Sequence, residues 1–103
     1  MSDRSLTKLL ASMLKIVDAI RREAQRAYRR FQDGTRHQLL AILRNAATDL
    51  LQHGLKGEHL RVFDALDALS AAQEIYFETF LARLERVRQN LHDLYLALGS
   101  VPI

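Results

Sequence analysis

The sequence predicts an all-α fold, and three observations lead to this prediction. Along two long stretches, apolar residues recur at alternating spacings of three and four, which places them on one face of a helix. The 103-residue chain has one proline, four glycines and few β-branched residues, a composition that helix propensity favours. No segment alternates between apolar and polar residues as a half-buried strand does. We therefore expect a single helical domain over residues 1–103.

The first helix is expected over residues 4–33. Ser2, Asp3 and Ser5 are suitable N-caps, and Gly34 stands where helices often end. The apolar spacings run 4, 3, 4, 3, 4, 3, 4, which is the seam that holds one helix face against a partner, as in a coiled coil. The seam consists of Leu6, Leu10, Met13, Val17, Ile20, Ala24, Ala27 and Phe31.

The second helix is expected over residues 36–53. Thr35 and Gln38 have the spacing of a capping box, in which each side chain satisfies a free backbone N–H at a helix start. Gly54 is suited to the left-handed conformation that ends many helices, and Leu55 supplies the hydrophobic contact that often follows. The inner stripe of this helix is Leu39, Leu43, Ala46 and Leu50.

The third helix is expected over residues 58–98, followed by a short tail, because no glycine or proline occurs between Gly57 and Gly99. Ser70 and Gln73 occupy two seam positions and interrupt the apolar stripe. One interpretation is a continuous or kinked helix, which gives a three-helix antiparallel bundle with long first and third helices. The alternative is a break near Ser70, where Ser-x-x-Gln has capping-box form, which gives four helices.

The unequal helix lengths of the three-helix interpretation predict a homodimer. At 1.5 Å per residue, a third helix that folds back beside the first would extend about 30 Å beyond it. Its overhanging half would expose several hundred Å² of contiguous apolar surface, more than monomers usually show. A second copy in a two-fold arrangement would cover it, since one self-complementary patch is enough. The candidate dimer interface is Phe77, Phe80, Leu84, Val87, Leu91 and Leu94.

Basic residues crowd the end of the first helix. Residues 1–47 carry a formal charge of +6 and residues 48–103 a charge of −3. Such a basic surface is typical of contact with a nucleic-acid backbone, although ion pairs with acidic residues of the third helix would also explain it. The candidate nucleic-acid patch is Arg22, Arg26, Arg29 and Arg30.

No combination of residues in the sequence indicates catalysis or a cofactor. The chain has no cysteine, no glycine-rich phosphate loop and no Ser/His/Asp arrangement. Glu74 and Glu78 lack the histidine three residues later that di-metal bundles use, and Asp49 with His53 supplies at most two ligands. We therefore expect no metal, no cofactor and no enzymatic activity.

The apolar runs are too short to span a membrane, and the first residues lack a secretory signal, so a cytoplasmic protein without membrane contact is expected. Our leading hypothesis is a non-enzymatic interaction or assembly module that acts as a homodimer, with another helical protein as a further partner. The alternative is a small nucleic-acid-binding protein that uses the arginine patch.

Overall fold

The computed structural model describes residues 2–26, 36–70 and 77–99. A 3-10 turn, η2 (Gly57–Leu60), leads into α4, and a π-helical turn, η3 (Tyr95–Gly99), follows α5. No strand occurs in these ranges, so the all-α prediction is confirmed. The α-helices are α1 (Ser2–Arg26), α3 (Arg36–Leu51), α4 (Arg61–Ser70) and α5 (Phe77–Leu94).

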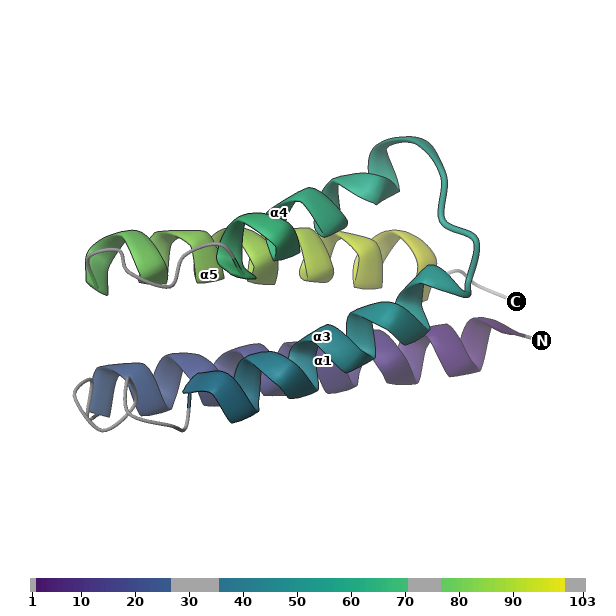
Figure 1. The fold of residues 1–103 in the computed structure, drawn as a ribbon. Coiled ribbons are helices and arrows are strands. Elements are labelled where there is room, and N and C mark those ends of the chain that lie inside the picture. Colours follow the sequence, from purple (N-terminus) through teal and green to yellow (C-terminus); the bar gives the residue numbers. More distant parts are fainter. Residues whose placement is uncertain (1, 27–35, 71–76, 100–103) are drawn as a thin grey trace.

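The helices form two layers in an elongated bundle of 46 × 21 × 19 Å. One layer holds α1 and α3, the other holds α4 and α5, and consecutive helices run antiparallel (Figure 1). Helix α1 packs against both α3 and α5, and α4 packs on α5. By contrast, α3 and α4 share few contacts, so the side of the bundle between them is the least closed.

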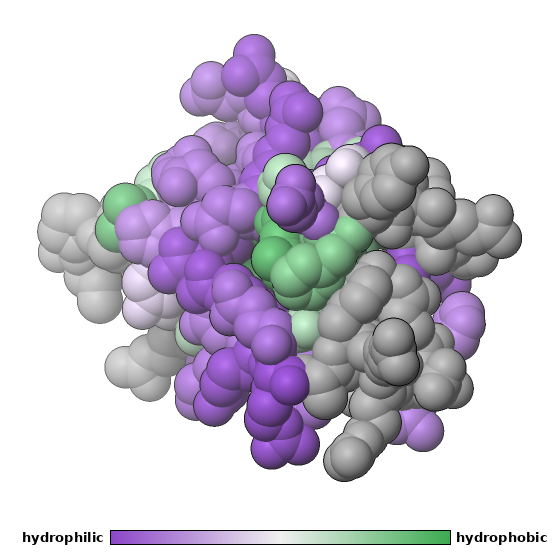
Figure 2. Space-filling view, turned by 90° about the vertical axis from the view of Figure 1, so that its left-hand side faces the viewer, coloured by the Kyte–Doolittle hydropathy of each residue, from purple (hydrophilic) through white to green (hydrophobic). Residues whose placement is uncertain are grey.

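The core follows the seam of α1. Each seam position in the described part of this helix is buried: Leu6, Leu10, Met13, Val17, Ile20 and Ala24. Ala27 and Phe31 lie outside the described residues. Seen from the end where α3 and α5 begin, hydrophobic side chains occupy the middle of the bundle and hydrophilic ones surround much of it (Figure 2).

The expected continuous third helix is wrong, and the four-helix alternative fits better. Helix α4 ends at Ser70, and α5 runs back beside it from Phe77. This reversal lets α5 pack on both α4 and α1, so that its apolar side faces the core of the same chain. The overhang expected from a single long helix is therefore absent from the described part of the chain. The capping box at Ser70 and Gln73 extends into residues that are not described.

The end of α4 is tied to α5 by one polar contact. The guanidinium of Arg83 on α5 donates a hydrogen bond to the carbonyl of Ala68, with a donor–acceptor distance of 2.9 Å. Carbonyls in the last turn of a helix have no partner within the helix, and this end of the helix dipole favours a cation. Arg83 therefore stabilises the end of α4 where the chain reverses direction.

Helix α3 ends at Leu51, two residues earlier than expected. Three successive backbone bonds from residue i to residue i−3 tighten its end: Gln52 to Asp49, His53 to Leu50 and Gly54 to Leu51. Gly54 has φ +67°, the left-handed conformation expected for it, and Gly57 has φ +63°. These two glycines redirect the chain between the layers.

Candidate interaction surface

The predicted dimer-interface residues lie inside the bundle. Leu84 is 1% exposed, and Phe80, Val87, Leu91 and Leu94 are likewise buried, while Phe77 is partly buried. They belong to the same core cluster as the seam of α1. The apolar surface from which we inferred an interface at these positions is therefore covered by the chain itself.

The predicted nucleic-acid patch is described only in part. Arg22 and Arg26 are exposed on α1, whereas Arg29 and Arg30 lie outside the described residues. Together with Ala19, Glu23 and Leu39 the two described arginines line a groove between α1 and α3. A guanidinium nitrogen of Arg26 lies 3.7 Å from the Glu23 carboxylate, so part of the positive charge in this groove is neutralised.

Charges on the outer side of the α1–α5 seam are paired with one another. Arg21 lies 3.5 Å from Asp18 and 3.2 Å from Glu85, and Arg88 lies 3.4 Å from Asp18 and 3.7 Å from Glu85. The four side chains form a ring that joins α1 to α5. Arg21 of α1 therefore pairs with Glu85 in the acidic half of the chain. Such ion pairs are the explanation of the basic residues that does not involve nucleic acid.

At the start of α3, Arg36 is 4% exposed. Its guanidinium carbon lies 5.0 Å from the centre of the Phe80 ring, a cation–π geometry. Beside it, a cavity of about 240 Å³ is lined by Arg36, His37, Leu40, Ala41, Arg44 and Ser70. From its charge alone, Arg36 is expected at the surface. The sequence nevertheless contains a feature that indicates its burial. Arg36 precedes Leu40 and Leu43 by four and seven residues, and so belongs to the inner stripe of α3.

The cavities show which side of α3 faces each neighbour. Leu39 borders the groove toward α1, whereas Arg44 borders the cavity that reaches Ser70 on α4. Successive helical residues are about 100° apart, which places Ala41, Thr48 and Leu51 within about 60° of Arg44. This side of α3 is exposed, and Leu51 is the extreme case at 59%.

The corresponding side of α4 is found in the same way. Asp64 and Ala68 border the groove toward α5, whereas Ser70 points to the α3 side. Phe63 and Asp67 lie within about 60° of Ser70 around the helix, Phe63 partly buried and Asp67 exposed. Leu60, directly before α4, is 44% exposed. We call this surface the α3–α4 face; it consists of Ala41, Arg44, Thr48, Leu51, Phe63 and Asp67.

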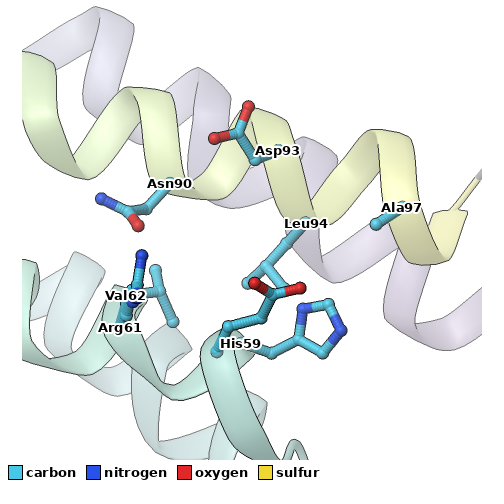
Figure 3. A pocket seen from close by; sticks show the side chains of 8 residues that line it. His59, Arg61, Val62, Asn90, Asp93, Leu94 and Ala97 are labelled. Carbon is cyan, nitrogen blue, oxygen red and sulfur yellow. The ribbon is translucent and has the colours of Figure 1, made fainter.

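A polar pocket of about 270 Å³ opens between the start of α4 and the end of α5. Figure 3 shows the side chains of Asn90 and Arg61 extending toward one another, with the Asp93 carboxylate turned away from the His59 ring. This histidine and this carboxylate do not converge on a common point as an acid–base pair would. His59 and Asp93 therefore do not form an acid–base pair in this pocket.

Within the described ranges, the structure groups no three His, Asp or Glu side chains in a way that could hold a metal ion. Nor is any helix in these ranges long and apolar enough to cross a bilayer. Comparison of the chain with protein-family models, with curated proteins and with solved structures finds no match.

Proposed function

We propose that this chain is a non-enzymatic helical interaction module that acts as a homodimer, with the α3–α4 face as its binding surface. The observation that carries the proposal is that the bundle is least closed between α3 and α4, and that Leu51, 59% exposed, lies on this side of α3. Covering an exposed leucine with a partner removes its apolar surface from water, which favours association.

The dimer proposal thus rests on a different surface from the one that the sequence suggested. Residues of α5 fill the core of their own chain, so they are not available to a partner. The α3–α4 face instead combines apolar side chains with one base, Arg44, and one acid, Asp67, both exposed. Interfaces between proteins that also exist apart commonly mix apolar side chains with charged ones in this way.

Light scattering after gel filtration over a range of micromolar concentrations tests the proposal. The wild-type chain is expected to elute with twice the mass of its 11.8 kDa chain. Leu51→Ser is expected to shift the mass toward that of the monomer. Ile42→Ser is the matched control, because Ile42 is 49% exposed on the same helix but lies outside the α3–α4 face. A wild-type monomer at every concentration, or equal effects of the two variants, would contradict the proposal.

Nucleic-acid binding is the second candidate, favoured by the exposure of Arg22 and Arg26 on one face of α1. A labelled DNA or RNA duplex should then shift in a gel at low salt, with affinity that falls steeply as salt rises. The double variant Arg22→Glu, Arg26→Glu should abolish the shift. An unshifted duplex at low salt with the wild-type chain would eliminate this candidate.

A further inference from the structure

The geometry points to a specific arrangement of the two copies: α3 of one chain packs antiparallel on α4 of the other around a two-fold axis parallel to the helices. This inference rests on the proposed function and adds the orientation of the partner. Three features of the α3–α4 face support it: the signs of its charges, the positions of the charged residues along the bundle, and the sizes of its side chains.

Two charged side chains on the α3–α4 face are unpaired within the described part of the chain. Neither the Arg44 guanidinium nor the Asp67 carboxylate has a hydrogen-bond or ion-pair partner in the part of the chain that the structure describes. On the opposite side of the bundle, by contrast, Arg21 and Glu85 belong to the closed ring between α1 and α5. The α3–α4 face thus presents a base on one helix and an acid on the other, each open to a partner.

The signs of these charges select the pairing of helices. Stacking α3 on α3 of a second copy would bring the exposed base of each copy toward the other, and stacking α4 on α4 would do the same with Asp67. Placing α3 on α4 of the second copy brings Arg44 toward Asp67 instead. Two-fold symmetry then forms this contact twice, because residue i of one copy meets residue j of the other and the reverse.

The positions of the two residues along the bundle agree with this arrangement. The cavity that Ser70 lines extends along α3 from Arg36 to Arg44, so Ser70 lies beside this stretch. Asp67 is about one turn earlier on the antiparallel α4 and therefore lies toward the Arg44 end of the stretch. A two-fold axis parallel to the helices keeps every residue at its own level while exchanging the positions of α3 and α4. Arg44 of one copy therefore comes to the level of Asp67 of the other, without any sliding of the helices.

Side-chain size on α3 permits the close approach that such packing requires. Ala41 is small, and Thr48 uses its hydroxyl within the helix, where Oγ1 donates to the Arg44 carbonyl at 3.2 Å. A hydroxyl with a partner of its own is less unfavourable to bury. Leu51 and Phe63 add apolar surface to the same face. The face therefore offers small and apolar side chains around the proposed Arg44–Asp67 pair.

A charge-reversal exchange tests the arrangement. Arg44→Glu alone creates two acid–acid contacts and Asp67→Arg alone creates two base–base contacts, so each variant is expected to dimerise at least about tenfold more weakly than wild type. Mixing the two variants is expected to restore a dimer. In the mixed pair, one contact joins the introduced acid to the introduced base, and the other joins the unchanged Arg44 to the unchanged Asp67. Analytical ultracentrifugation measures the masses, and one variant with a fluorescent label shows that the recovered dimer contains both chains.

Asp64→Arg is the control, because Asp64 borders the groove toward α5, and its dimer is expected to match wild type. Circular dichroism checks that each variant keeps its helical content. Two weakened variants that do not recover on mixing would refute the α3-on-α4 arrangement, as would single variants that dimerise like wild type. In either case a wild-type dimer would leave the proposed function intact, whereas a monomeric wild type would refute both.

Discussion

Replacing Leu84 by alanine is expected to lower the free energy of unfolding of the single chain by about 3 kcal/mol. Leu84 is 1% exposed and belongs to the core cluster that joins α5 to α1 and α4. Truncation of a buried leucine removes transfer free energy and leaves a cavity, and the two effects together cost about 2–5 kcal/mol. For a chain of this size, a loss of about 3 kcal/mol corresponds to a melting temperature roughly 12–24 °C lower.

Urea unfolding followed by circular dichroism, at concentrations low enough for the chain to be monomeric, measures this loss. The control is Ile42→Ala, which truncates a residue 49% exposed on α3 and is expected to change the free energy by less than about 1 kcal/mol. If Leu84 belonged to a contact between copies, its truncation would weaken association but leave the dilute monomer nearly unchanged. A loss below about 1 kcal/mol in the monomer would therefore refute the four-helix packing.

Three further sets of substitutions test local features of the fold. Gly54→Ala should lower the free energy of unfolding in urea by about 1–2 kcal/mol, because φ is +67° while nothing lies within 4 Å of an added Cβ. Gly54→Asn should lower it less, and equal losses would contradict an origin in backbone strain. A double-mutant cycle between Arg36 and Phe80 should give a coupling free energy of about 0.5–2 kcal/mol. If the losses of the two single variants are additive, the cation–π contact does not stabilise the fold. Arg21→Ala should lower the free energy of unfolding by less than about 1 kcal/mol, and by less still at high salt, since the ion pair with Glu85 is partly exposed. A loss that does not change with salt would contradict this expectation.

The seam of α1 was the feature best predicted from the sequence. Six of its positions, from Leu6 to Ala24, are buried in the structure, because a three-and-four spacing fixes which side of a helix meets the core. The all-α class followed from the same periodicity. In helix α3 the expected inner stripe was only partly correct, since Leu39 is only partly buried whereas Leu40 beside it is buried. An amphipathic stripe predicts which side of a helix faces the core, but the neighbouring helices determine which residues at the edge of the stripe are buried.

The chain reversal after α4 could not be decided from the sequence, and the expected dimer interface depended on it. A seam indicates that a partner helix exists, and the pattern is identical whether that partner belongs to the same chain or to another. Ser70 and Gln73 indicated a helix start, yet the absence of glycine and proline favoured continuity. Burial of Phe80 and Leu84 inside one chain depends on long-range contacts between α5 and α1, which local residue preferences do not contain.

Unequal helix lengths still argue for a partner, although at another place in the molecule. Helix α4 has 10 residues and is about 15 Å long, whereas α3 has 16 and is about 24 Å long, so α4 is too short to cover the whole of α3. Leu51, in the last turn of α3, accordingly has the highest exposed fraction of the large hydrophobic residues in the described part of the chain. A second copy that packs its own α4 on α3 would cover part of the exposed side of α3 that the first α4 leaves open. The charge-reversal exchange at Arg44 and Asp67 therefore tests whether the shortness of α4 creates a binding surface or only a loosely packed edge.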